Sequence, residues 1–496
     1  MRLPGSRQRD AGGAPSRFEQ RLADRFDRTQ KWLDERLGTA SFARNALRKV
    51  YPDHWSFLLG EIALFCLVVL VFTGVFLTFF YVPDTRGTTV YQGPYVPLRG
   101  QQVSDAYNSV LRLSFQVRAG LLMRQTHHWA ALVFVAAIVV HLCRIFFTGA
   151  FRRPRELNWI IGISLLFLGM AEGFTGYSLP DDLLSGVGLR IFDSVVLAIP
   201  VVGTWIASLG FGGEFPAPEM ISRLFVFHVM LLPAILIAGV AVHIGILVLQ
   251  KHTQYPGTGR TERNVVGKRF WPEQTFKSVS LLLLTAGTLA GLGGLFQINP
   301  VWQYGPYNPA NVSSPAQPDW YIGFLDGALR LGPPWSFKLF GYTISEVFWP
   351  AILFPAVAFG ILILWPWIER RFTRDYAEHH LLNRPRDVPL RTAVGMAGLT
   401  VFFVCFLEGG NDILAVLLNV SVEAITRILQ YAFVLGPLVA GLITYLVCRS
   451  LRATGMHPAK ATAGMRLERT ASGGYETVPI ESLEGAAQLP PQGSPH

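Results

Sequence analysis

The sequence predicts an all-α membrane protein that crosses the bilayer eight times. Of its 496 residues, 51% are hydrophobic and only 15% are charged, and the mean hydropathy is +0.35, a balance that is typical of polytopic membrane proteins. A helix needs about 20 apolar residues to cross the hydrocarbon layer. Eight segments meet this requirement or come close to it: 56–80, 125–147, 157–178, 224–250, 278–298, 344–368, 392–408 and 429–449.

Loop charges predict the orientation of these spans. The net charge is +10, and basic residues collect at 152–155, 251–277 and 370–391 and in both tails. Most acidic loop residues lie in the other connections, although the loop after the first span also carries five arginines. Because positive loops stay in the cytoplasm, we expect a cell-membrane protein with both termini cytoplasmic. The lipid bilayer explains this charge better than nucleic acid does, and we expect no nucleic-acid partner.

Two of the spans each carry a pair of widely spaced histidines. His127 and His141 are 14 residues apart, and His228 and His243 are 15 apart. At about 100° per residue, these spacings bring each pair back to within roughly 40° and 60° of one direction. Each helix therefore presents two imidazoles on one face, separated by about 21–22 Å along its axis.

Ionisable groups inside a membrane span are costly and usually functional. One such histidine is compatible with a proton relay or a hydrogen-bonded structural role, whereas four at this spacing favour axial ligands of two haem irons. The orientation pairs His127 with His228 near the outer surface, and His141 with His243 near the inner one. His128 lies about 140° from the direction of His141, and we expect it not to be a ligand.

Glycines recur at the same interval on the two other early spans. Gly60 and Gly74 are 14 residues apart, as are Gly162 and Gly176. A helix approaches the edge of a flat porphyrin closely only where it carries no side chain. Ordinary packing of helices through small residues is the alternative, but the match to the histidine interval favours the porphyrin interpretation.

Three arginines lie near the histidines. Arg124 and Arg144 are each three residues from a histidine, and Arg223 is five residues before His228. We expect them to pair with haem propionates. A positive flank at the end of a span is the alternative.

Two outer segments predict a pocket beside the outer histidine pair. One contains Gly-Tyr-Ser-Leu-Pro at 176–180 and is followed by an interrupted apolar stretch at 185–210, which we expect to form short surface helices. The other contains Pro-Asp-Trp-Tyr at 318–321. Together they bring the carboxylate of Asp319 and the phenols of Tyr177 and Tyr321 to the outer side. A structural turn is the alternative for the second motif.

A second pocket is expected beside the inner histidine pair. Glu61 lies just inside the first span, where a carboxylate is expensive, and Lys251 and His252 follow the fourth span. The last two residues are equally compatible with solvated end caps. Glu172, in the third span, is interpreted as a hydrogen-bonded structural acid.

The domain organisation follows from these segments. We expect a basic cytoplasmic N-terminal region at 1–50, in which 17–50 forms a surface-bound amphipathic helix or a solvated one. A four-helix bundle holding two b haems is expected at 51–255, and a C-terminal membrane domain with four further helices at 256–450. The polar tail at 451–496 is expected to be disordered and cytoplasmic.

With these motifs in order, the chain resembles cytochrome b of the cytochrome bc complexes over about 50–450. Asp319 replaces the commoner Glu of the Pro-Glu-Trp-Tyr motif, and the 15-residue interval in the fourth span is similar to that of the cytochrome b6 branch. The stretch Tyr-Gly-Pro-Tyr-Asn-Pro at 304–309, which leads into 317–321, and the long tails resemble the actinobacterial menaquinol–cytochrome c reductases.

The resemblance implies a quinone cycle with two non-covalent b haems. Menaquinol is oxidised at the outer pocket, where Asp319 accepts a proton and Tyr177 and Tyr321 are hydrogen-bond partners. One electron passes to a Rieske iron–sulfur subunit and the other to the outer and then the inner haem, and quinone is reduced at the inner pocket. The resemblance also implies a c-type cytochrome subunit, a homodimer and a possible association with cytochrome c oxidase.

The chain departs from the family pattern before the fifth span. An Asp follows the Lys there in the family, whereas Ser278 follows Lys277 here. We therefore predict that Glu61, with Lys251 or His252, supplies the inner proton donor. Two alternatives stay open: another bis-histidine dihaem cytochrome, acting as a quinone-linked dehydrogenase anchor, and a transporter that uses its histidines as proton relays.

Overall fold

The computed structural model describes residues 47–311 and 317–455. It also describes 24–25, 28–29, 31–32, 34–36 and 38 near the N-terminus, and the backbone of two strands at 465–469 and 475–479. The amphipathic helix expected over 17–50 falls largely outside these residues, although those described at 24–25, 28–29, 31–32 and 34–36 are helical.

The eight predicted membrane helices are confirmed in the described part of the chain. Two of them begin with a π-helical turn, labelled η4 (Phe270–Gln274) and η5 (Trp349–Leu353), and a third contains such a turn, η3 (Phe227–Leu231), within its length. The helices are α3 (Leu59–Thr78), α5 (Gly120–Thr148), α6 (Glu156–Ser178), α9 (Met220–Val226) continuing through η3 into α10 (Leu232–Gln250), α11 (Thr275–Leu295), α14 (Phe354–Thr373), α15 (Pro389–Gly409) and α17 (Val422–Gly455).

The chain forms two compact units. One comprises Met1–Leu382 with Phe402–Gln430, and the other comprises Asn383–Val401 with Tyr431–His496. The domain boundary predicted between 255 and 256 does not coincide with this division and stays a prediction.

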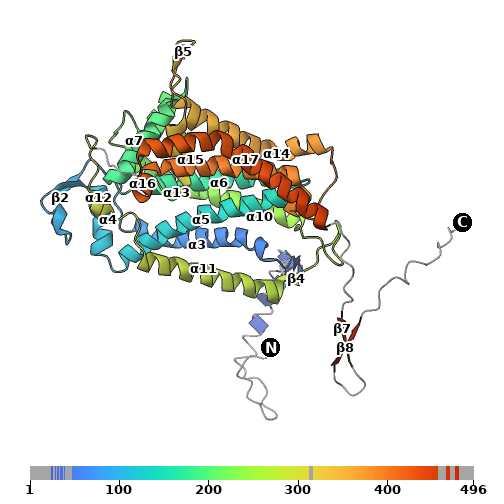
Figure 1. Cartoon of the computed structure of the whole chain (residues 1–496). Helices are drawn as coiled ribbons and strands as arrows, with labels where there is room; N and C mark the ends of the chain where they lie inside the picture. Colours follow the sequence, from blue (N-terminus) through green and yellow to red (C-terminus); the bar gives the residue numbers. More distant parts are fainter. Residues whose placement is uncertain are drawn as a thin grey trace. The chain divides into compact units, whose positions relative to one another are not determined.

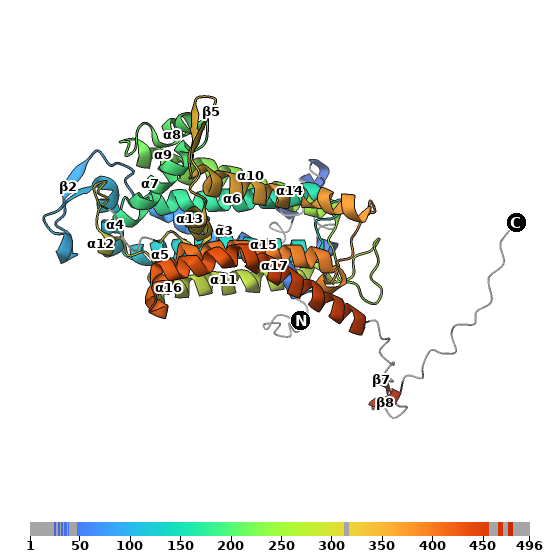
Figure 2. The same cartoon turned by 45° about the horizontal axis from the view of Figure 1, so that its top comes forward.

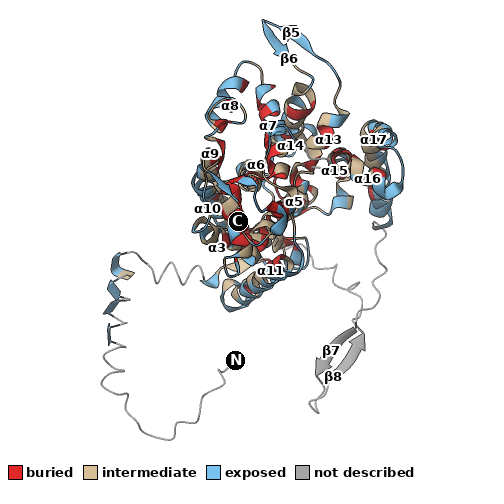
Figure 3. Cartoon of the chain, turned by 90° about the vertical axis from the view of Figure 1, so that its left-hand side faces the viewer, coloured by how far each residue is buried: buried red, intermediate tan, exposed pale blue. Residues whose placement is uncertain are grey.

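A four-helix bundle occupies the centre of the first unit. α3 packs against α5, α5 against α6, and α6 against α10, while α11 covers α3 and α5 (Figures 1 and 2). The buried residues concentrate on the facing sides of these helices (Figure 3). Small residues such as Ala63, Cys66 and Ala130 let the helix backbones approach, and Phe134 and Leu236 fill the remaining space. The helices therefore pack closely along α3, α5 and α6. Helices α5 and α10 face each other across the interior of the bundle.

Short helices cover the end of the bundle that carries His127 and His228, which is the predicted outer end. They are η2 (Val96–Leu98), α4 (Asp105–Phe115), α7 (Leu183–Leu197), α8 (Gly203–Phe211), α12 (Val301–Tyr304) and α13 (Trp320–Leu331), with the strand pair β2 (Thr88–Val90) and β3 (Gln102–Ser104) beside them. Side-chain caps start two of them: Ser104 Oγ accepts from the Tyr107 N–H at 3.2 Å, and the Asp182 carboxylate accepts from the Ser185 N–H at 3.3 Å. The short helices expected over 185–210 correspond to α7 and α8.

On the inner side, a two-residue strand pair joins the starts of two spans. β1 (Val50–Tyr51) pairs with β4 (Lys268–Arg269), just before η1 (Trp55–Phe57) with α3 and before η4 with α11. The η6 turn (Pro385–Asp387) precedes α15 in the other unit. Two hairpins complete the described strands, β5 (Phe337–Leu339) with β6 (Tyr342–Ile344), and β7 (Met465–Arg469) with β8 (Tyr475–Pro479).

The tail expected to lack structure over 451–496 contains the last residues of α17 and the β7–β8 hairpin. In the hairpin, two antiparallel strands satisfy each other's backbone groups, so the expectation does not hold for these residues. The rest of the tail lies outside the described part of the chain.

A buried polar network fastens α13 to α15 and α16 (Asn411–Leu418) in the first unit. The Arg330 guanidinium donates to the Glu408 carbonyl oxygen at 3.2 Å and to Asn411 Oδ1, and it forms an ion pair with Asp326 at 2.8 Å. The fully buried Glu408 side chain accepts from Asn411 Nδ2 at 2.9 Å. Because α13 begins at residue 320, this network also fixes the Pro-Asp-Trp-Tyr segment.

Replacing Arg330 by Leu is expected to destabilise the fold by about 2 kcal/mol, because it leaves buried acceptors without a donor. Thermal denaturation of the purified protein measures this as a lower melting temperature. Arg427→Leu, at an exposed position on α17, is the control and is expected to change it little. Equal losses for the two variants would contradict the importance of the network.

Candidate functional site

The four predicted ligand histidines face the interior of the bundle from two opposite helices. His127 and His141 lie on α5, and His228 and His243 lie on the η3–α10 segment. The rings of His127 and His228 have centroids 6.1 Å apart and planes at 79°. Imidazole nitrogens bind metal ions at about 2 Å, so two rings on opposite sides of one ion have centroids about 6 Å apart. This separation fits a metal between the outer pair. His141 and His243 lie against Gly60 and Gly162, respectively, further along the same two helices.

Hydrogen bonds fix the orientation of the His127 ring. Thr73 Oγ donates to the Val69 carbonyl oxygen at 2.7 Å, so its oxygen is free to accept from His127 Nδ1 at 2.9 Å. A hydrogen bond at Nδ1 leaves Nε2 unprotonated, which is the form that ligates metal.

The His228 ring is held in the same way from α6. His228 Nδ1 lies 3.0 Å from the Glu172 carbonyl oxygen, 3.3 Å from a Glu172 carboxylate oxygen and 3.4 Å from Thr175 Oγ. Glu172, interpreted from the sequence as a structural acid, is thus a direct neighbour of a predicted ligand.

Each predicted glycine lies against one predicted histidine. An added Cβ at the glycine would meet the imidazole Cε1 at or below ordinary contact distance, so any larger side chain would displace the ring. These distances are 3.3 Å for Gly60 and His141, 3.2 Å for Gly74 and His127, 3.4 Å for Gly162 and His243, and 2.4 Å for Gly176 and His228. The role of these glycines in admitting a cofactor stays a prediction.

The π-helical turn η3 explains the unequal histidine intervals. The Leu232 N–H bonds to the Phe227 carbonyl oxygen five residues earlier, and Pro233 has no N–H to continue the regular ladder. Such a turn accommodates one additional residue within a single helical turn. The 15-residue interval from His228 to His243 therefore gives nearly the same rotation as the 14-residue interval on α5.

His128 points away from the bundle interior, as its position in the sequence predicts. Its Nε2 lies 3.0 Å from both carboxylate oxygens of Asp319 at the start of α13. Asp319 also accepts from Tyr321 Oη at 3.3 Å and from Asn299 Nδ2 at 3.4 Å. The sequence did not lead us to expect this contact, because the two residues lie 191 positions apart.

The two predicted phenols lie near this carboxylate. Tyr321 is 3% exposed, and burial, followed by the neighbouring Asp319 carboxylate, raises its pKa well above the ordinary value. It therefore remains a hydrogen-bond donor. Its hydroxyl lies so close to Gly173 that an added Cβ there would come within 2.3 Å. Tyr177 lies beside Gly188 on α7, within electrostatic reach of Asp319.

Two of the three predicted arginines have unsatisfied buried nitrogens. Arg124 Nη2 donates to the Asn299 carbonyl oxygen at 2.7 Å, whereas Nη1 finds no partner among the described residues. Arg144 lies over the Phe57 ring at 4.2 Å, and its Nε and Nη2 find none there either. Arg223 instead donates to two carbonyls at the end of α8, Ser208 and Leu209, and so fastens α8 to α9.

On the inner side, Glu61 contacts the residue that replaces the family's aspartate. Ser278 Oγ donates to Glu61 Oε2 at 2.7 Å, and Gln274 Nε2 donates to Glu61 Oε1 at 3.0 Å. Two donors from α11 and η4 thus hold the carboxylate at the edge of α3. Glu61, after burial, also raises the pKa of the Tyr51 phenol.

The other two inner candidates differ from each other. The His252 ring packs on Tyr51 at 4.5 Å, and burial, followed by nearby cations of which Lys49 is the largest contributor, lowers its pKa to about 4. At neutral pH it is therefore an uncharged imidazole, and its buried Nε2 has no hydrogen-bond partner among the described residues. Lys251 is exposed at the end of α10, and no described contact brings its side chain to Glu61.

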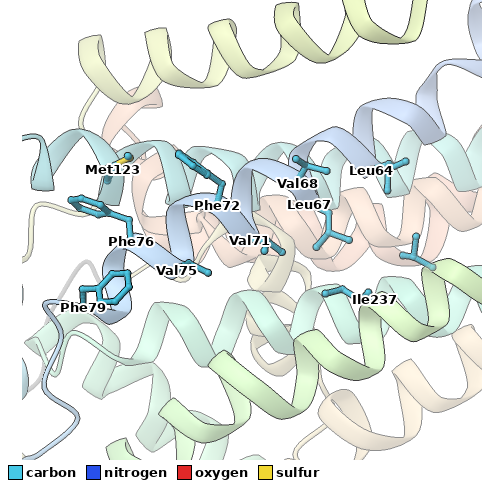
Figure 4. A pocket seen from close by; sticks show the side chains of 11 residues that line it. Leu64, Leu67, Val68, Val71, Phe72, Val75, Phe76, Phe79, Met123 and Ile237 are labelled. Atoms are coloured by element: carbon cyan, nitrogen blue, oxygen red, sulfur yellow. The ribbon is translucent and has the colours of Figure 1, made fainter. Parts of the chain in front are cut away.

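An apolar groove of about 720 Å³ runs between α3 and α10 (Figure 4). Only apolar side chains line it, from Leu64 to Phe79 on α3, with Met123 on α5 and Ile237 and Val240 on α10. The groove therefore provides apolar surroundings for a hydrophobic group between these helices.

Sequence reasoning missed several contacts that complete these sites. A signal was present for the threonines, because Thr-Gly occurs at 73–74 and again at 175–176, immediately before both outer glycines. The inner glycines have no such neighbour. No comparable signal marks His128 with Asp319, or Gln274 with Glu61.

Comparisons with known proteins agree with this geometry. The family model described as Cytochrome b(N-terminal)/b6/petB matches residues 132–306. Proteins described as cytochrome bc1 complex cytochrome b subunit are 50% identical in Corynebacterium diphtheriae (85% of this chain, 77% of the relative) and 47% identical in Streptomyces coelicolor (89% and 81%). The corresponding protein of Mycobacterium tuberculosis is 50% identical over 85% of this chain and 76% of its own.

The chain belongs to the cytochrome b family. A solved structure described as Hyperthermophilic respiratory Complex III shares its fold, with a TM-score of 0.61 and 19% identity over 84% of this chain and 99% of the other. This cytochrome b is therefore a multi-pass membrane protein of the respiratory type, and its family binds haem b. The observed residues fit that group: paired imidazoles with oriented Nδ1 atoms, close glycines and unsatisfied buried guanidinium nitrogens.

Thr73→Val is expected to raise the midpoint potential of the outer haem alone. The variant removes the acceptor at His127 Nδ1, so the imidazole donates less charge to a bound iron and the reduced state becomes easier to reach. A redox titration of the visible spectrum measures the shift. Thr78→Val, which removes an exposed hydroxyl from the same helix, is the control. A shift of the inner haem instead would refute the assignment of His127 to the outer centre.

Proposed function

We propose that this cytochrome b is the membrane subunit of a quinol–cytochrome c oxidoreductase. In this proposal, menaquinol is oxidised at the outer pocket, one electron leaves to a Rieske iron–sulfur subunit, and the other crosses the membrane through two haem centres to reduce quinone at the inner pocket. The observation that carries the proposal is the placement of two imidazole pairs about four helical turns apart along one bundle, each against two glycines of the neighbouring helices.

Haem b, when bound, supplies one-electron transfer. His127 with His228 would hold the outer group and His141 with His243 the inner one, so both irons would be six-coordinate and closed to oxygen. Arg124 and Arg144 support this proposal, because their free nitrogens need anionic partners. Arg223, with its guanidinium on two carbonyls of α8, is no longer proposed as a propionate partner.

At the outer pocket, Asp319 is the proposed proton acceptor. Its carboxylate accepts from three described side chains, which fix its orientation. An ionised carboxylate is able to take the proton that a quinol hydroxyl releases on oxidation. Tyr177 and Tyr321 are the proposed hydrogen-bond partners of the quinol.

At the inner pocket, Glu61 is the proposed proton donor, with Ser278 and Gln274 positioning it. The neutral His252 is a hydrogen-bond partner for quinone rather than a source of charge, and Lys251 is the weaker candidate because it is exposed. Both pockets would open toward lipid, which is the source of a hydrophobic quinone.

The remaining parts of the proposal concern partners and placement. We propose a c-type cytochrome subunit as the final electron acceptor, assembly as a homodimer and association with a cytochrome c oxidase. The cell membrane is the proposed location, with both termini in the cytoplasm, because the basic loops lie on that side.

A redox titration of the visible spectrum tests the central proposal. The wild type is expected to show two b-type components that menaquinol reduces and that an outer-site quinone analogue protects from reduction. His141→Ala is expected to remove one component and keep the other, whereas His379→Ala, in an inner loop, retains both. A colourless wild type, or one with a single haem, would overturn the proposal.

Glu61→Gln is expected to slow reoxidation of the inner haem by about tenfold or more, because the amide is unable to deliver a proton. Flash-induced or stopped-flow haem kinetics measure this step separately from outer quinol oxidation. Glu156→Gln, on the same side of the membrane at the start of α6, is the matched control. Unchanged reoxidation in Glu61→Gln would reject the role of this carboxylate.

A further inference from the structure

The carboxylate of Asp319 is held from a neighbouring helix rather than by its own. Asp319 occupies the N-cap position of α13, where an aspartate side chain normally accepts from the first free N–H groups of the helix. Here it makes no such bond. Its two oxygens are directed instead to His128 Nε2 on α5, at 3.0 Å each.

This contact is a hydrogen bond between the His128 imidazole and the Asp319 carboxylate. An N–H placed evenly between both oxygens of a carboxylate favours the ionised acid and limits its rotation. The side chains are 17% and 10% exposed, so water competes little for the contact. Tyr321 Oη and Asn299 Nδ2 add one longer contact to each oxygen, at 3.3 and 3.4 Å.

The position of His128 in the sequence links this contact to the outer centre. His127 and His128 are consecutive residues of one uninterrupted helix, so their side chains leave the axis about 100° apart. One ring is directed to His228 and the other to Asp319. A single helical turn therefore sets the distance between the outer imidazole pair and the carboxylate.

We infer that His128 is the positioning residue of the outer quinol site, holding the Asp319 carboxylate in place and aimed at the quinol hydroxyl. This inference rests on the proposed function. The inference also explains how the shorter Asp319 side chain functions in place of the Glu of the family motif. His128 on α5 supplies a hydrogen-bond donor that holds the shorter carboxylate in position.

The chemistry assigned to this pair is a single proton transfer. The O–H bond of the quinol breaks, and the proton forms a new O–H bond with a carboxylate oxygen of Asp319. The second hydroxyl proton of the quinol leaves with the electron that passes to the Rieske subunit, and the other electron passes to the outer centre, as the proposed function requires. His128 keeps its own Nε2 proton throughout and forms no bond to the substrate.

Three variants separate positioning from general support of the fold. His128→Leu removes the donor, His128→Gln retains an N–H that reaches toward Asp319, and Trp129→Phe is the matched control. Trp129, the next residue of α5, donates to the Phe296 carbonyl oxygen at 2.8 Å and does not contact Asp319. The visible spectrum of each complex establishes that the haems are retained.

In the assembled complex, His128→Leu is expected to lower menaquinol oxidation about tenfold at neutral pH. Removing a hydrogen-bond donor from a carboxylate makes the carboxylate easier to protonate. The acid limb of the pH–rate profile is therefore expected to move to higher pH by about one unit. The described titratable groups that face Asp319 are His128, Tyr321 and Tyr177, and only the first is changed.

His128→Gln is expected to recover part of the rate and of the pH profile, and Trp129→Phe to match the wild type. In an Asp319→Asn background, His128→Leu is expected to add no further loss, because the two residues act as one unit. If His128→Leu does not assemble, His128→Asn takes its place, since the shorter amide does not reach the carboxylate.

Infrared difference spectroscopy of the resting complex gives a readout without turnover. The band of the protonated Asp319 carboxyl, identified by its loss in Asp319→Asn, is expected to appear at higher pH in His128→Leu than in the wild type. An unchanged pH profile and an unchanged band would overturn the inference. Absence of menaquinol oxidation in the wild type would instead refute the proposed function, and the infrared comparison would still decide the pairing.

Discussion

The organisation of the outer half of this bundle depends on one constraint, which is that each outer imidazole needs an acceptor at Nδ1 to fix its orientation. Each outer ring meets this need at Nδ1, where Thr73 or the Glu172 carbonyl accepts its proton. Those acceptors come from α3 and α6, the helices that also bring glycines against the rings. Helices α3 and α6 therefore orient the imidazoles that α5 and the η3–α10 segment carry. A flat cofactor would bind between these imidazoles.

The outer and inner halves of the bundle differ in how polar their surroundings are. At the outer end, a threonine precedes each glycine, and a carboxylate lies 3.3 Å from His228 Nδ1. At the inner end, His141 Nδ1 has no described partner. More electron-donating surroundings stabilise an oxidised iron, so with haem bound at both pairs, as proposed, this asymmetry would favour electron movement from the outer centre to the inner one. The direction of transfer in the proposed function thus has a basis in local hydrogen bonding.

Much of this protein could be predicted from the sequence. Eight apolar runs, the 14-residue intervals and the outer motifs led to the helical membrane fold and to a four-helix bundle, and the structure brings Gly60, Gly74, Gly162 and Gly176 each against one histidine. Helical periodicity is local, so residues on one span reveal their common face without knowledge of the fold. The exclusion of His128 from the ligands followed from the same arithmetic.

What the sequence by itself determined was therefore which residues share a face and at which depth they lie. Only the tertiary structure decided their partners. It joined His128 to Asp319 across 191 residues and Glu61 to Ser278 across 217, turned Arg223 onto α8, and absorbed the additional residue after His228 in a π-helical turn. The physical reason is that contacts between helices depend on how spans pack and where backbone bonds shift, and neither is encoded in the periodicity of a single span.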